Sequence, residues 1–204
     1  RDCLLSRGLG DVYKRQFKDS SNLELKAYYF YSKRGLPGAV TLYNPISDET
    51  LWDENSFVQV RYKKQFSPRW SMQVQAKYNH GWNKYEDEGN EYADGLYRAV
   101  HRQDEYYLSA TALYRPWNAL SLSLAQDGAI NKLRSNLPDC PFPTRYTSLT
   151  AFNARYRQGM VTATGSLIYT NITERVKVGD APADFQRLAP SFTVSLQPWQ
   201  EQLF

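Results

Sequence analysis

Apolar and polar residues alternate with a period of two along most of the chain. In segment 70–79, WSMQVQAKYN, every second residue from Trp70 to Tyr78 is apolar or aromatic, and the residues between them are polar. Successive side chains of a β-strand point to opposite faces, so this pattern predicts a strand with one apolar and one polar face. About eight strands are predicted in this way. They are 23–31, 58–66, 70–79, 106–114, 120–126, 148–156, 161–170 and 192–196.

The predicted strands are suited to crossing a membrane. Most are close to the ~9–11 residues that a tilted strand needs to cross a bilayer, and no apolar run approaches the ~18 residues of a spanning helix. The chain is 15% aromatic and has 16 tyrosines, yet its mean hydropathy is −0.64. Only every second residue of a spanning strand faces lipid, so this combination predicts an all-β protein, an antiparallel transmembrane β-barrel in the outer membrane.

Short and long connections alternate between the predicted strands. The turns SPR, PWNA, RQGM and QPWQ are tight, whereas segments 34–55, 86–104, 126–144 and 176–186 form long connections. Outer-membrane barrels have short periplasmic turns and long extracellular loops, so the alternation predicts which side of the membrane each strand end faces.

Aromatic residues flank the short turns, where the periplasmic interface would lie. We interpret them as a membrane-interface girdle: Phe66, Trp70, Tyr114, Trp117, Tyr156 and Trp199. A second girdle is expected near the long connections, at Tyr29, Tyr31, Tyr78, Trp82, Tyr106 and Tyr169. The alternative is a soluble β-sandwich with these aromatics in its core, but sandwich aromatics need not cluster at strand ends.

The polar faces are expected to line the inside of the barrel. Glu24, Lys26 and Arg61 belong to them, so the lumen would be filled with water or with an inserted domain. If the barrel belongs to a receptor, ligand contacts are expected from aromatic residues of the long connections and the upper lumen, because flat rings bury much area at low entropic cost. The candidates are Tyr43, Trp52, Tyr85, Tyr92, Tyr97 and Phe142. The alternative is that these rings pack on one another and order the loops.

Metal and catalytic motifs are weak in this sequence. An acidic cluster is a weak candidate for calcium, although it matches no EF-hand spacing and also fits a solvated loop. It consists of Glu86, Asp87, Glu88, Glu91 and Asp94. The isolated histidines give little support for haem or iron ligation by the protein, and we expect no cofactor. The sequence has no nucleophile elbow, phosphate loop or zinc signature. We therefore expect no enzyme; an outer-membrane hydrolase using His101 and Asp104 is the weaker alternative.

The first sixteen residues are expected not to belong to the native protein. Segment 1–16 follows neither a strand nor a helix period, and its back-translation resembles a transposon-based sequencing adapter read in frame. Without it, four basic and two acidic residues are lost, and the formal net charge falls from +4 to +2. No basic footprint for nucleic acid remains.

Residues 17–204 are expected to be part of a larger barrel. The final segment QPWQEQLF reads as a turn followed by the start of another strand. The alternative is a small closed barrel of eight strands that ends at the aromatic Phe204.

Several segments resemble TonB-dependent outer-membrane receptors of Bacteroidota-type bacteria, with cobalamin-receptor-like members the most similar. They include YYFYSKRGLPGAVTLYNP, LWDENSFVQVRYKKQFS, EYYLSATALYRPW, LSLSLAQDGAIN and ATGSLIYTNITERV. The resemblance implies a plug domain inside a barrel of about twenty-two strands. It also implies import of a scarce nutrient, such as cobalamin or an iron chelate, with energy relayed by TonB, ExbB and ExbD through the plug, and in some cases a surface lipoprotein partner. A passive porin is the alternative.

Overall fold

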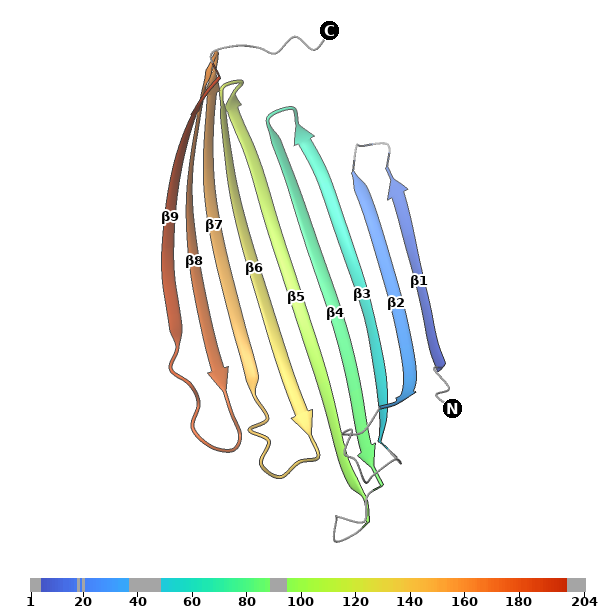
Figure 1. The fold of residues 1–204 in the computed structure, drawn as a ribbon. Helices are drawn as coiled ribbons and strands as arrows, with labels where there is room; N and C mark the ends of the chain where they lie inside the picture. The colour runs from blue at the N-terminus through green and yellow to red at the C-terminus, as the bar shows by residue number, and fades with distance from the viewer. Residues whose placement is uncertain (1–4, 18, 20, 37–48, 89–94, 198–204) are drawn as a thin grey trace.

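The computed structural model describes residues 5–17, 19, 21–36, 49–88 and 95–197, which form one antiparallel sheet (Figure 1). Nine strands lie in the sheet in sequence order. They are β1 (Leu5–Gln16), β2 (Asn22–Gly35), β3 (Thr50–Ser67), β4 (Trp70–Asp87), β5 (Tyr97–Trp117), β6 (Leu120–Ser135), β7 (Thr144–Gln158), β8 (Val161–Arg175) and β9 (Phe185–Leu196). The all-β, antiparallel architecture predicted from the alternation is confirmed. In this part of the chain, no helix has the length and apolar character to span a membrane.

The two ends of the sheet carry different connections. The strand ends that the short turns join lie at the upper end of Figure 1, and the strand ends that the long connections join lie at the lower end. The β3–β4, β5–β6 and β7–β8 turns each join strands that are paired almost to their ends. The alternation of short and long connections is therefore present as predicted, and the long connections all lie on one side.

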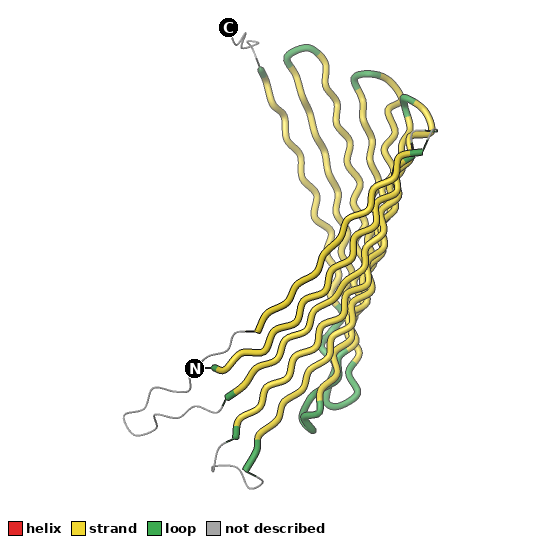
Figure 2. Tube along the Cα trace, turned by 90° about the vertical axis from the view of Figure 1, so that its right-hand side faces the viewer, coloured by secondary structure: helices red, strands yellow, loops and turns green. Residues whose placement is uncertain are grey.

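The sheet has one apolar face and one polar face. Figure 2 shows a single twisted and curved layer. Among the described residues only one apolar side chain, Ala99, is buried. The apolar face instead exposes a band of large side chains that includes Leu25, Val58, Tyr78, Leu108, Leu124, Phe152, Leu167 and Leu188. Such an exposed band is what lipid covers in a barrel, and it differs from a sandwich core, which two sheets bury between them.

The strands extend further toward the long connections than the sequence predicts. β4 runs to Asp87 instead of 79, β5 begins at Tyr97 instead of 106, and β6 runs to Ser135 instead of 126. Beyond the apolar band the residues of a strand no longer alternate between apolar and polar, although the backbone ladder continues. The predicted long connections are therefore too long, and part of each belongs to a strand.

The segment 1–16 contains a strand that the sequence does not predict. β1 pairs with β2 from Leu5 to Gln16 without a register shift. Backbone groups alone form this ladder, so an edge strand needs no apolar alternation. Its register places Asp11 opposite Ala27, on the apolar face. A carboxylate in that position is costly where lipid covers the sheet.

Replacing Gly159 with alanine is expected to destabilise the protein by about 1 kcal/mol, because Gly159 has a φ of 56° and a Cβ is strained in that region. Gly159 lies in the turn between β7 and β8. The control is Gly81→Ala in β4, where a Cβ meets nothing within 4 Å and no loss is expected. Guanidinium unfolding measures the free energy of unfolding of the two variants. An equal change in the two variants would contradict the strain expected for a Cβ at Gly159.

Candidate functional site

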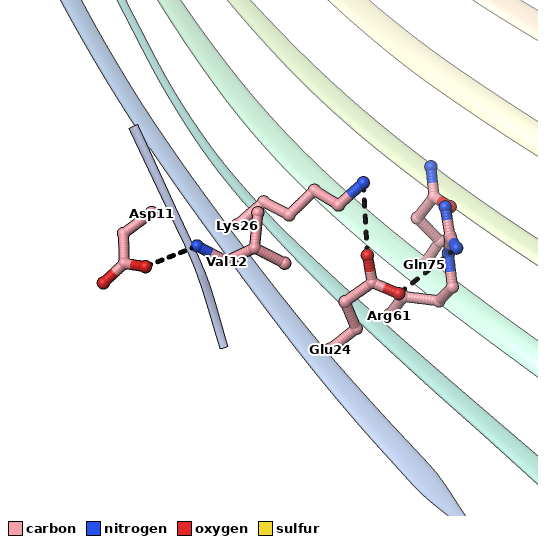
Figure 3. Close-up of polar contacts among 6 residues, drawn as sticks. All are labelled: Asp11, Val12, Glu24, Lys26, Arg61 and Gln75. Carbon is pink, nitrogen blue, oxygen red and sulfur yellow. Dashed lines mark hydrogen bonds and ion pairs between the residues drawn. The ribbon is translucent and has the colours of Figure 1, made fainter. Parts of the chain in front are cut away.

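A ladder of polar side chains crosses the polar face of β2, β3 and β4. The register aligns Glu24, Arg61 and Gln75 in one row (Figure 3). Arg61 donates from Nε to Gln75 Oε1 at 3.2 Å and from Nη1 to Glu24 Oε2 at 3.4 Å. Lys26 Nζ lies 3.1 Å from Glu24 Oε1. These side chains are on the predicted luminal face, and their charges are largely paired within the sheet.

A second polar cluster lies on the same face, near the long connections. Asp53 lies 2.9 Å from the Arg34 guanidinium, and it accepts a hydrogen bond of 2.6 Å from Asn83 Nδ2. His101 is the register partner of Asn83 on β5. The alternation does not predict this cluster, because all four residues lie outside the alternating segments.

Two of the predicted ligand-binding aromatics lie beside this cluster. Tyr85 of β4 and Tyr97 of β5 have ring centroids 6.1 Å apart in an edge-on arrangement. Both occupy odd positions of their strands, like Asn83 and His101, and therefore belong to the polar face. We call Arg34, Asp53, Asn83, His101, Tyr85 and Tyr97 the luminal rim.

The other predicted ligand-binding residues do not join the luminal rim. Trp52 lies on the opposite, apolar face, where the Nζ atoms of Lys33 and Lys84 sit 5.0 and 4.3 Å from its ring centroid. Phe142 lies in the β6–β7 connection with a φ of 47° and lines a hollow of about 620 Å³ next to Arg134. Tyr43 and Tyr92 lie outside the described residues.

The acidic cluster is divided between the two faces of β4. Glu86 belongs to the apolar face, where its carboxylate lies 2.7 Å from Lys84 Nζ and 2.6 Å from Arg98 Nε. The hydrogen bond from Lys84 lowers the pKa of Glu86, with Arg98 adding to the effect. Asp87 follows on the polar face, and Glu88 lies just beyond the strand. Glu91 and Asp94 are outside the described residues, and no metal-binding group of three ligands occurs among the described ones.

His101 and Asp104, the pair considered for hydrolysis, lie on opposite faces of β5. They are three positions apart along the strand, so their side chains point to opposite faces. Asp104 lies on the apolar face instead. There it accepts a hydrogen bond of 2.8 Å from Tyr78 Oη and contacts His80 Nδ1 at 2.8 Å. The structure therefore does not bring His101 and Asp104 together.

Several aromatic side chains lie at the strand ends that the short turns join. Phe66 and Trp70 stack with centroids 4.6 Å apart across the β3–β4 turn. Tyr114, Trp117 and Tyr156 are exposed at the corresponding ends of β5 and β7. Trp199 lies outside the described residues.

No protein-family model and no curated protein matches the chain. Solved structures do match its fold. The FrpB iron transporter from Neisseria meningitidis (F3-3 variant) has a TM-score of 0.77 at 16% identity, over 97% of this chain and 36% of that one. The ferric preacinetobactin receptor BauA from Acinetobacter baumannii has a TM-score of 0.65 at 12% identity, over 93% of this chain and 36% of that one. The siderophore receptor PiuA from the same organism has a TM-score of 0.60 at 8% identity, over 93% and 38% of the two chains.

These matches agree with the exposed apolar band of the sheet. The chain spans just over a third of the length of each of these proteins. The predicted location in the outer membrane is confirmed by this shared fold. The chain has the fold of one part of an outer-membrane β-barrel, as found in this iron transporter and these two receptors.

Proposed function

We propose that the chain is part of a TonB-dependent outer-membrane receptor that binds a scarce nutrient and imports it into the periplasm. The observation that supports this most strongly is the match of nearly the whole chain to about a third of an iron transporter. Energy would come from the TonB, ExbB and ExbD proteins through a plug domain supplied by the rest of the parent protein.

The arrangement of the polar face supports a role in ligand passage. Arg61 and Glu24 are paired within the sheet, so the charges of this part of the hydrated wall are held in place. The luminal rim adds two tyrosine rings beside Asp53 and Asn83. Aromatic and polar groups together suit a large nutrient complex, because the rings supply contact area and the polar groups fix its orientation.

The nutrient class is either an iron chelate or cobalamin. The solved relatives are described as an iron transporter, a siderophore receptor and a ferric preacinetobactin receptor, which supports an iron chelate. The sequence resemblance to cobalamin-receptor-like members of Bacteroidota-type bacteria supports cobalamin. A surface lipoprotein partner belongs to the same proposal.

Uptake by the full-length parent protein tests the proposal. The protein is produced in a host that lacks its own receptors, and entry of radiolabelled ferric chelates and of labelled cobalamin is followed with and without TonB. We expect uptake of one class to be lost without TonB or with a protonophore. Equal uptake by cells with TonB and cells without TonB would reject active transport.

The second candidate is a passive porin-like barrel, because a hydrated luminal wall also fits a diffusion pore. Liposome swelling separates the two candidates. An active receptor with a plug gives little sugar flux when reconstituted alone. Free flux of small sugars without TonB would favour the porin.

We also propose that segment 1–16 is not native and that residues 17–204 are a partial barrel domain. The outward position of Asp11 supports this, since the neighbouring outward positions of β2 and β3 are apolar: Leu25, Ala27, Val58 and Val60. In the parent protein, a different strand would then pair with β2.

A further inference from the structure

The apolar face carries a groove at the centre of β3 to β6. The groove has a volume of about 580 Å³. Its lining includes Val58, Ala76, Tyr106, Leu108, Gly128 and Ile130. Gly128 opens the groove, because a Cβ at this position would meet nothing within 4 Å. A groove lined in this way, on a face that lipid covers, has the chemistry to hold an acyl chain.

A basic cluster lies on the same face, between this groove and the long connections. Arg102 of β5 and Arg134 of β6 are direct register partners. Lys132, two residues from Arg134, has its Nζ 5.8 Å from the centroid of the Tyr106 ring, which also lines the groove. Gly128 and Arg134 are six residues apart, roughly 20 Å along the strand, which is a suitable separation between an acyl chain and a headgroup.

The two arginines form an unfavourable pair without a ligand. Like charges directly opposite each other destabilise a pair of strands. Both side chains are exposed, and neither has a salt bridge within 4 Å among the described residues. Asp104, two residues from Arg102 on this face, contacts His80 and Tyr78 at 2.8 Å and interacts electrostatically with Arg134 without forming an ion pair within 4 Å. An anion held between Arg102 and Arg134 would relieve the repulsion.

We propose that this face binds one phosphate-bearing lipid of the leaflet next to the long connections. The phosphate lies between Arg102 and Arg134, because guanidinium groups match the geometry of phosphate oxygens, and Lys132 adds a point charge. One acyl chain fills the groove over Gly128. The assignment depends on the apolar face being in the membrane and is independent of which nutrient the receptor imports.

Binding is measured by native mass spectrometry of the delipidated full-length parent protein. The probes are bis-phosphorylated lipid A and the same lipid with both phosphates removed. We expect the double variant Arg102→Gln/Arg134→Gln to bind the phosphorylated probe roughly tenfold or more weakly, because charge-assisted hydrogen bonds are lost. Binding of the dephosphorylated probe is expected to be unchanged. Lys132→Gln is a milder variant for use if the double variant does not assemble.

The groove is tested separately with Gly128→Leu, which fills it and is expected to weaken binding of both probes. Gly81→Leu is the matched control, because it adds the same side chain to the polar face, where there is also no neighbour within 4 Å. Equal binding by the wild type and the arginine variant would overturn the phosphate assignment. Unchanged binding by Gly128→Leu, together with competition by inorganic phosphate, would indicate a free-phosphate site and overturn the lipid assignment.

Discussion

An arginine in place of Leu124 is expected to destabilise the folded barrel by about 2–4 kcal/mol, the usual cost of this charge near the bilayer midplane. Leu124 is exposed on the apolar face between Ala112 and Phe152. Leu124 lies four residues from the start of β6. With the strand tilted by about 40° from the membrane normal, this distance places Leu124 roughly 10 Å from the level of the β5–β6 turn. That depth is close to the middle of an apolar band about 25 Å tall.

Ala125→Arg is the matched control, because it introduces the same charge one residue later on the polar face. The measurement is guanidinium unfolding of the full-length protein in lipid vesicles, followed by tryptophan fluorescence. We expect little loss of stability for Ala125→Arg. A similar loss for the two variants would contradict the assignment of the faces.

Removal of both rings at the luminal rim, by Tyr85→Ala and Tyr97→Ala together, is expected to weaken binding of the imported nutrient roughly tenfold or more. Buried aromatic anchors commonly contribute more than 1 kcal/mol each to binding, and these two rings lie side by side on the polar face. Equilibrium binding of the labelled nutrient to whole cells measures the dissociation constant.

Tyr29→Ala is the control for that double variant, because it removes a ring of the same size from the apolar face of β2. Its affinity for the nutrient is expected to match the wild type. An unchanged dissociation constant in the folded double variant would mean that the two rings only pack on each other and order the rim. That was the alternative interpretation of the aromatics in the long connections.

The alternation of side chains predicted the part of the fold that crosses the membrane. In β4, the pattern from Trp70 to Tyr78 identified the strand and its apolar face, because lipid on one side imposes a strict sequence constraint there. From His80 to Asp87 the same strand continues through residues that no longer alternate between apolar and polar. No sequence constraint marks this extension, since only the backbone ladder maintains it.

The candidate site was harder to predict for the same reason. Trp52 and Tyr85 were selected as loop residues, but both are in strands and they point to opposite faces. Successive residues of a strand point to opposite faces. Which face a given residue occupies can be assigned only where the strand and its register with its neighbours are known. The luminal rim and the basic pair of Arg102 and Arg134 also depend on cross-strand register.

β1 illustrates the opposite case, a strand that no sequence pattern predicts. Its backbone pairs with β2 along its whole length, yet Asp11 lies on the apolar face. Pairing at an edge requires only free N–H and C=O groups, which any segment can supply. A ladder alone is therefore weak support for a native strand, whereas the outward-facing side chains are informative.

The central claim is that this sheet is one part of a larger transporter barrel, and an uninterrupted read of the parent gene across both ends of the chain tests it most directly. We expect a signal peptide, a plug domain and further strands before position 17 in place of segment 1–16, and more strands after Phe204, to a total of about twenty-two. A gene that starts near Phe17 and stops at Phe204 would contradict the account, because it would encode a small closed barrel without a plug.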